Sequence, residues 1–300
     1  MISICIPVYN YDAGKLIEDL VQQAISSEIN IEINILNDGS GISFTQIMRS
    51  WSGGVVNYFE FTNNAGRVHA RNLLISKSNF ENILFLDCDV QLIFENYLES
   101  YVQEIIKGYQ VITGGTVYQK SFPGKQYSLH WAYGHYMQKN HFNNKDINPY
   151  RSFMTNNFLI QKDIAKAIGF NESIKNYGHE DTIFGFELEK RNIGIKHINN
   201  PVLHASFDTN EIFLAKTRQS VENLSIVNNI LGEKNLSNIS LIQFYKKIKR
   251  YKLMPLFKIS TKVLMPIIHK LLIRGKGGIK MLQFYKLLVY VKSNTGEQNL

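Results

Sequence analysis

The chain has 300 residues, of which 44% are hydrophobic and 19% charged, and its formal net charge is +8. This length fits one catalytic domain with an additional segment, because domains usually contain about 100–200 residues. Thirteen of the 33 cations lie between Leu241 and Ser293, a stretch without any acid, whereas the other 20 cations face 25 acids. The basic character is therefore local, which argues against nucleic acid as a partner.

Cysteine usage and the N-terminal residues predict a cytoplasmic protein. The two cysteines, Cys5 and Cys88, are too few for a disulfide framework. The opening residues MISICIPVYN lack a cationic leader and a small-residue cleavage site, so no export signal is expected. No uncharged apolar run approaches the roughly 20 residues of a spanning helix, and any membrane contact should be peripheral.

The first part of the chain alternates short β-branched runs with longer amphipathic stretches. The expected elements are, in chain order, Ile2–Val8, Lys15–Ser26, Ile31–Leu36, Val55–Phe61, Val68–Ser76, Ile83–Leu86 and Tyr97–Ile106. This alternation predicts an α/β fold built from βαβ units. Ile2–Val8 and Ile83–Leu86 are apolar nearly throughout, as is typical of parallel strands covered by helices on both faces.

The middle of the chain is irregular and rich in aromatic residues between Thr116 and Arg151, where we expect loops and a helix over a site. Further elements are expected at Phe153–Ile160, Asp181–Arg191, Ile193–Ile198 and Val202–Leu203. Beyond Glu211 the pattern is helical, and Pro255, Pro266 and Gly275–Gly278 should divide the basic tail into short pieces. The sequence thus predicts a catalytic domain over residues 1–230 and a helical basic extension over residues 231–300.

Polar residues stand where the expected strands end. They are Asn10, Asp38, Asn64, Asp87 and Asp89. Because open α/β sheets bind ligands at the carboxyl ends of their strands, this edge is the predicted site.

The segment Asp87-Cys88-Asp89 is a DXD motif at the end of a buried strand. Residues i and i+2 of an extended segment point the same way, so both carboxylates can face one hard cation and a diphosphate bound to it. Taken alone, the pair could instead begin a turn or cap a helix, because the motif is common.

Several further motifs accompany the DXD motif in a fixed order. They are Pro7-Val8-Tyr9-Asn10, Asn37-Asp38-Gly39-Ser40, Asn64-Ala65-Gly66, Arg67-Val68-His69-Ala70-Arg71-Asn72, Gly178-His179-Glu180-Asp181 and His204. With these motifs the chain resembles family-2 glycosyltransferases of the GT-A fold, from Ile2 to about Phe207. The resemblance implies a Rossmann-like nucleotide-binding half, a mixed central sheet, a UDP-sugar donor and inverting transfer without a covalent intermediate.

The resemblance also implies which residues contact the nucleotide. They are Pro7, Val8, Tyr9, Asp38, Asn64, Gly66, Arg71, Asp87 and Cys88. Arg71 has the fork geometry suited to phosphate or carbonyl oxygens, and Arg67 is its alternative. Without the other motifs, Asp38 and Asn64 would be interpreted as residues of a turn or a helix cap.

For the metal, the family pattern implies Asp89 and His204 as ligands, with Asp87 as a water-mediated or ribose partner. Mixed oxygen and imidazole ligation favours Mn²⁺ over Mg²⁺, which is the alternative. A single histidine after an apolar pair can also be a simple strand residue.

Asp181 is the implied catalytic base and Glu180 the implied partner of acceptor hydroxyls. A positioned carboxylate can accept the proton of a hydroxyl nucleophile, which contributes about 10²–10⁴-fold in rate. The alternative is that both acids only stabilise the start of a helix, worth about 0.3–1 kcal/mol. His179, next to Glu180, is an alternative acceptor of the same proton. Trp131, Asn156 and His179 are candidates for contact with the donor or acceptor sugar, although large aromatic residues are more often core.

The basic tail alternates apolar residues with lysines, as in Phe257-Lys258-Ile259. One interpretation is an interfacial segment on an anionic membrane, each nearby cation contributing about 1 kcal/mol. The other is a helical appendage packed on the catalytic domain. We favour peripheral attachment to the inner face of the cytoplasmic membrane, because the cations have no acids to offset their repulsion.

The predicted function is transfer of a hexosyl or N-acetylhexosaminyl group to a growing glycan or a lipid-linked acceptor, as in polysaccharide assembly. A nicotinamide oxidoreductase would need a G-x-G-x-x-G turn where this chain has Pro7-Val8-Tyr9-Asn10. A glycoside hydrolase would use two carboxylates without a nucleotide. The remaining alternative is a non-catalytic carbohydrate- or nucleotide-binding protein of the same fold.

Overall fold

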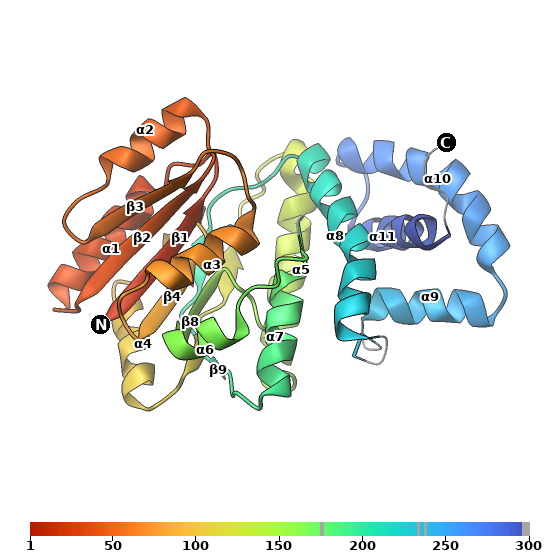
Figure 1. Cartoon of the computed structure of the whole chain (residues 1–300). Coiled ribbons are helices and arrows are strands. Elements are labelled where there is room, and N and C mark those ends of the chain that lie inside the picture. Colours follow the sequence, from red (N-terminus) through yellow and green to blue (C-terminus); the bar gives the residue numbers. More distant parts are fainter. Residues whose placement is uncertain (175–176, 233–234, 237–238, 296–300) are drawn as a thin grey trace. The chain divides into compact units, whose positions relative to one another are not determined.

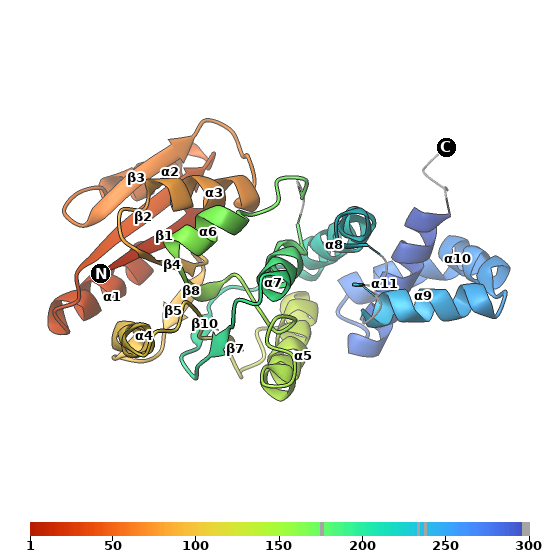
Figure 2. The same cartoon turned by 60° about the horizontal axis from the view of Figure 1, so that its bottom comes forward.

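The computed structural model describes residues 1–174, 177–232, 235–236 and 239–295 (Figures 1 and 2). The chain forms two compact units. Unit 1 comprises Met1–Gln119, Gln138–Lys175 and Glu180–Ser206. Unit 2 comprises Lys120–Met137, Asn176–His179 and Phe207–Leu300. These units are defined by compactness alone, so the predicted end of the catalytic domain at residue 230 stays a prediction.

Unit 1 is built around a mixed seven-stranded sheet with the order β3-β2-β1-β4-β8-β6-β9. Its strands are β1 (Ile2–Val8), β2 (Ile31–Asp38), β3 (Val56–Phe61), β4 (Asn82–Leu86), β6 (Val111–Thr113), β8 (Asn157–Gln161) and β9 (Lys196–His197). The first four strands are parallel, and β8 runs antiparallel to both β4 and β6. The expected α/β class with a mixed central sheet is confirmed.

Helices cover both faces of this sheet (Figures 1 and 2). They are α1 (Gly14–Ser26), α2 (Ile42–Ser50), α3 (Arg67–Lys77), α4 (Tyr97–Ile106), α6 (Lys162–Ile168) and α7 (Glu180–Lys190). Because side chains alternate along a strand, Ile4 and Ile6 of β1 join the core that α1 and α4 close, whereas Cys5 points to α3, its Sγ 3.8 Å from the carbonyl oxygen of Leu74. Burial on both faces explains why β1 is apolar throughout.

A second sheet in unit 1 has the order β5-β10-β7, formed by Val90–Leu92, Val202–His204 and Thr116–Tyr118. Strand β5 begins directly after the DXD motif, and its antiparallel pairing with β10 sets His204 opposite Val90. The small sheet therefore joins the DXD motif to a histidine far along the chain.

Unit 2 is helical. It contains η1 (Lys125–Tyr127), the beginning of α5 (Ser128–Asn144), α8 (Asn210–Leu231), α9 (Ser240–Arg250), α10 (Met254–Ile273) and α11 (Ile279–Asn294). Thr209 caps α8 by accepting a hydrogen bond from the backbone N–H of Ile212. Helix α11 packs against α8, α9 and α10, and its Leu282, Leu288 and Val291 are fully buried (Figure 1). Within the described part of the chain, none of the helices has the length and apolar character to cross a membrane.

Three expectations for the elements need correction. The strand expected from Phe153 begins only at Asn157. Helix α2 is an unexpected element, and only Met48 of its nine residues is buried. Pro266 does not divide the tail, because α10 continues through it, whereas Pro255 lies in the first turn, where a missing N–H is tolerated. The glycines after Gly275 do separate α10 from α11.

Candidate functional site

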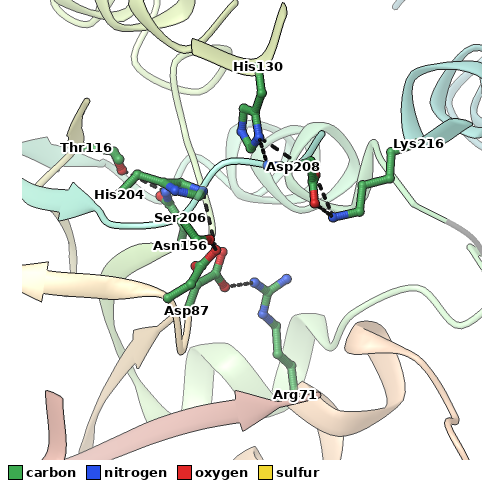
Figure 3. A network of polar contacts seen from close by, with 10 residues as sticks. Arg71, Asp87, Thr116, His130, Asn156, His204, Ser206, Asp208 and Lys216 are labelled. Atoms are coloured by element: carbon green, nitrogen blue, oxygen red, sulfur yellow. Dashed lines mark hydrogen bonds and ion pairs between the residues drawn. The ribbon is translucent and has the colours of Figure 1, made fainter. Parts of the chain in front are cut away.

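The two acids of the DXD motif, in the turn between β4 and β5, have different partners (Figure 3). Arg71 Nη2 of α3 donates a hydrogen bond to Asp87 Oδ1 at 2.8 Å. Asp89 Oδ2 instead accepts a hydrogen bond of 2.8 Å from the Ser206 hydroxyl and lies 3.6 Å from His204 Nε2. The motif thus connects a buried cation with a carboxylate–imidazole pair.

Arg71 is 1% exposed, although arginine is seldom buried. Its guanidinium lies over the ring of Phe170, 5.4 Å from the ring centroid, and Nη2 also donates to the carbonyl oxygen of Thr155 at 3.4 Å. Its Nη1 is 3.6 Å from a carboxylate oxygen of Glu180. Arg71 therefore links the acid at the strand end to the first residue of α7.

Glu180 is buried, and its carboxylate forms a 2.7 Å ion pair with Arg67 Nη2 in addition to the contact with Arg71. Two residues one helical turn apart on α3 therefore hold this acid from one side. The structure gives Glu180 an internal role in charge pairing, and its predicted contact with acceptor hydroxyls stays a prediction.

Asp181 is the next residue of the same first turn. Removal from water, and next the charge of Glu180, raise the pKa of Asp181 to about 6, while the backbone N–H of Thr182 and the two arginines of α3 pull the pKa down. The N–H of Thr182 donates to Asp181 Oδ1 at 2.8 Å. A carboxyl group that ionises near pH 6 has a suitable pKa for a general base at neutral pH.

His204 of β10 and Asp89 present one imidazole nitrogen and one carboxylate to the same region. The imidazole is stacked on Tyr118 with ring centroids 5.3 Å apart, and the N–H of Ala205 donates to the backbone carbonyl of Asp89. These contacts fix the ring beside the acid. Within the residues that the structure describes, no group of three His, Cys, Asp or Glu side chains is gathered for a metal. A cation here would therefore need further ligands, such as diphosphate oxygens or water.

Asp38 at the end of β2 organises the turn that starts α3. Its carboxylate accepts hydrogen bonds from the N–H groups of Ala65 (2.7 Å) and Gly66 (3.0 Å), and its backbone carbonyl accepts one from Asn64 Nδ2 (3.2 Å). Gly66 has a φ of +91°, which favours glycine. Burial raises the pKa of Asp38, and these two amides oppose that shift. The structure thus brings three predicted nucleotide residues together.

The other predicted nucleotide residues lie at the ends of β1 and β4. Pro7 and Val8 finish β1, and Tyr9 follows it with half of its surface exposed. Cys88 lies between the two acids, and burial raises the pKa of its thiol, so it is a poor nucleophile. These residues occupy the expected edge of the sheet.

Asn156 reaches the same region from the turn before β8. Its Nδ2 donates to Thr116 Oγ1 at 2.7 Å, and its backbone carbonyl accepts from the N–H of Asp87 at 3.2 Å (Figure 3). Asn156 is thus bonded to the strand beside His204 and to the DXD motif. Its predicted contact with a sugar stays a prediction.

Two residues of the predicted site, His179 and Trp131, belong to unit 2. His179 has a φ of +72°, and its Nε2 is 3.4 Å from the hydroxyl of Ser220. Trp131 makes edge-to-face contacts with Phe122 and His135. These contacts are internal to unit 2.

Sequence reasoning missed several residues of the network. Ser206, Thr116 and Tyr118 surround Asp89, Asn156 and His204, and no motif marks them. Ser206 could have been noted, because it stands two residues after His204. In unit 2, Asp208 holds Lys216 through two hydrogen bonds of 2.9 and 2.7 Å, and its N–H donates to His130 Nδ1 (Figure 3).

Comparison with known proteins extends this description. Residues 3–174 match the family described as Glycosyl transferase family 2. An uncharacterized glycosyltransferase of Rickettsia bellii (strain RML369-C) is 36% identical over 101 residues, which are 33% of this chain and 14% of that protein. The chain thus spans about a seventh of the length of this relative.

Solved structures share the fold at low identity. S. aureus TarS 1-349 is 16% identical with a TM-score of 0.55, covering 100% of this chain and 93% of that chain. The mannosyltransferase PcManGT from Pyrobaculum calidifontis, in complex with GDP-Man and Mn²⁺, is 12% identical with a TM-score of 0.60, covering 99% and 88%. Glucosyl-3-phosphoglycerate synthase from Mycobacterium tuberculosis, with Mn²⁺ and UDP, is 15% identical with a TM-score of 0.51, covering 75% and 78%.

Proposed function

Because this chain belongs to glycosyl transferase family 2, we propose that it transfers a sugar from a UDP-sugar to a hydroxyl group of an acceptor. The observation that supports this most is the chain of charges from Asp87 through Arg71 to Glu180, which places the base candidate Asp181 next to the ion-paired network of the strand-end acids. A nucleotide-sugar enzyme needs both features in one unit, a charged site for the diphosphate and a group that takes a proton.

In the proposed reaction Asp181 accepts the proton of the acceptor hydroxyl. The hydroxyl oxygen forms a bond to the anomeric carbon as the bond from that carbon to the diphosphate oxygen breaks, so the nucleoside diphosphate leaves with the electron pair. Attack from the face opposite the leaving group inverts the anomeric configuration. The pKa of Asp181, raised to about 6, leaves the carboxylate mostly ionised at neutral pH yet basic enough to take the proton.

Asp89 and His204 are the proposed metal ligands, with Asp87 bound through water or ribose. The donor set fits Mn²⁺, because a carboxylate and an imidazole nitrogen face each other 3.6 Å apart with Tyr118 and Ser206 holding them. Mg²⁺ is the second choice. When bound there, the ion would neutralise charge on the departing diphosphate. The Mn²⁺ complexes of PcManGT and glucosyl-3-phosphoglycerate synthase support this choice of metal.

The remaining details of the proposal follow the family resemblance. Structures of TarS and of glucosyl-3-phosphoglycerate synthase contain UDP, which supports uridine in the donor. We place the nucleotide against Pro7, Val8 and Tyr9, with Asp38, Asn64 and Gly66 shaping the loop. The transferred group would be a hexose or an N-acetylhexosamine, and the acceptor a glycan or a lipid-linked oligosaccharide at the inner face of the cytoplasmic membrane.

The proposal is tested with Asp181→Asn, which keeps the size of the side chain and removes the proton acceptor. Transfer should fall about 10²–10⁴-fold, while Mn²⁺-dependent UDP affinity measured by calorimetry should persist. Asp163→Asn is the matched control, because Asp163 is an exposed acid in the first turn of α6. Normal turnover of Asp181→Asn would refute the base assignment.

The same calorimetry separates a transferase from a non-catalytic binding protein of this fold. A transferase should bind UDP with Mn²⁺, lose most of that affinity with chelator or in Asp89→Ala, and release UDP when donor and acceptor are both present. Binding of a UDP-sugar without any release of UDP across a panel of acceptors would favour the non-catalytic alternative.

A further inference from the structure

The outer face of α10 carries an apolar stripe that is exposed among the described residues of unit 2. Leu256, Ile259, Val263 and Ile267 are 59%, 62%, 55% and 53% exposed. Their spacing of three and four residues puts them on one face of the helix. Single exposed apolar residues are ordinary, but four in register between Leu256 and Ile267 form a continuous surface.

The stripe is distinct from the face by which α10 joins unit 2. Thr261, Ile268 and Leu272 are the buried residues of α10, and the helix packs on α11 and α8 (Figures 1 and 2). Helix α10 is therefore apolar on two faces, only one of which is used inside the fold. The exposed Tyr251 and Leu253 extend the apolar surface into the turn before the helix.

Exposed cations also lie on α10. Lys258, Lys262 and Lys270 are exposed on α10. The segment from Leu241 to Ser293 contains neither Asp nor Glu. An occupant of this surface must therefore offer both negative charge and an apolar layer.

We infer that the stripe and its lysines dock unit 2 on an anionic lipid bilayer, with α10 lying in the plane of the headgroups. A bilayer with acidic headgroups offers charge at its surface and hydrocarbon just beneath, which matches lysines beside partly inserted leucine and isoleucine. The helix does not meet the requirements for crossing the membrane, in agreement with an in-plane position.

Other occupants fit less well. A second copy of this chain would bring a second cationic segment against the first, and like charges repel. A nucleic acid would use the lysines through its phosphates but leave the apolar stripe in water. The inference also restricts the contact to part of the tail, because α11, with its buried Leu282, Leu288 and Val291, belongs to the core of unit 2.

Vesicle sedimentation with the full chain tests the inference. We expect binding to phosphatidylglycerol–phosphatidylcholine vesicles that weakens with salt, and little binding to pure phosphatidylcholine. Ile259→Gln/Val263→Gln/Ile267→Gln should weaken binding about tenfold, because partitioning scales with inserted apolar area. Lys258→Gln/Lys262→Gln/Lys270→Gln should weaken it by about fivefold for each lysine near the surface.

The control is Ile25→Gln/Ile106→Gln, which changes two residues of unit 1 that are 74% and 80% exposed and should bind as the parent does. Equal vesicle binding by the parent and the apolar triple variant would overturn the inference. So would a parent dimer in analytical ultracentrifugation that the triple variant lacks. The assay contains no nucleotide or acceptor, so failure of the proposed transferase activity and failure of membrane docking are separate outcomes.

Discussion

Arg71 shows how a single buried cation can organise several acids. It is 1% exposed and pairs with Asp87 and Glu180, and Arg67 adds a second ion pair to Glu180. Exposed ion pairs contribute little to stability, whereas removal of one partner from a buried pair leaves an uncompensated charge. Arg71 therefore stabilises the position of both acids, and its influence on a bound nucleotide would pass through Asp87.

Arg71→Met should lower the free energy of unfolding by about 3–5 kcal/mol, because the buried Glu180 would lose its contact with Arg71 and Asp87 would lose its ion pair. The matched control is Arg49→Met. Arg49 forms two hydrogen bonds with Glu60 at 2.7 and 2.8 Å, but both side chains are exposed, so the loss should be much smaller than in Arg71→Met. Urea unfolding of both variants measures the difference, and similar losses would contradict the importance of burial.

The raised pKa of Asp181 predicts two linked pH effects. The carboxyl must be ionised to take a proton, so kcat/KM should fall about tenfold per pH unit as the pH drops below about 6. The same shift means that the folded state holds this proton more tightly than the unfolded chain does. The contribution of Asp181 to stability is therefore most favourable below the pKa of the unfolded chain, near 4, and is lost as the pH rises through about 6.

Asp181→Asn removes that poorly solvated charge. Above pH 6 the variant should be more stable than the parent, by on the order of 2 kcal/mol, and the difference should vanish near pH 4. Thermal unfolding at both pH values checks the sign. A variant that is less stable than the parent at pH 7.5 would indicate that Asp181 mainly stabilises the start of α7.

At the scale of elements, β8 is held in place by Asn157, which is fully buried. The hydroxyl groups of Tyr97 and Tyr101 on α4 each donate to Asn157 Oδ1 at 2.6 Å, and Asn157 Nδ2 donates to the carbonyl oxygens of Gly115 (2.8 Å) and Asn200 (3.1 Å). One amide thus ties α4, β8 and the segments flanking β7 and β10 together. Asn156 directly precedes Asn157, and His204 ends the strand that follows Asn200, so the positions of both residues depend on this amide.

Gly114→Ala should test the tightness of this junction. A methyl group there would clash with the carbonyl oxygen of Asn200 and would lie 2.6 Å from both Asn157 Nδ2 and the Tyr101 hydroxyl. We expect a loss of about 1–3 kcal/mol in the free energy of unfolding, as is usual for overpacking. Gly194→Ala is the control, because an added methyl group meets nothing within 4 Å at Gly194. Equal stability of the two variants would contradict the description of a closed junction.

At the scale of the whole molecule, local patterns predicted the elements better than their assembly. Apolar runs located β1 and β4 because both strands are buried on both faces. The polar residues after them lie at the carboxyl ends of these strands, as expected. The pairing of β5 with β10, which brings Asp89 to His204, depends on hydrogen bonds between distant backbone segments that no local pattern records.

The sequence also does not predict which charged side chains are buried. Arg71 and Glu180 read as helix-surface or ligand residues, because a motif does not reveal how many acids converge on one guanidinium. The sequence treats the tail as one basic segment. In the structure α11 belongs to the core of unit 2, and only part of α10 has exposed apolar residues. Periodicity predicted helices there, whereas the face that each helix buries is decided by its neighbours.

The layout of unit 2 has a consequence for how the protein is made on the ribosome. Its segments come from residues 120–137, from the short stretch before Glu180 and from Phe207 onward, and α11 near the end of the chain supplies much of its buried core. Every strand of unit 1 has been synthesised by His204, so that unit can begin to fold while translation continues. The earlier segments of unit 2 cannot complete their packing until α11 has left the ribosome, and a messenger truncated before Ile279 would yield a nascent chain whose α8 and α9 lack their contacts with α11.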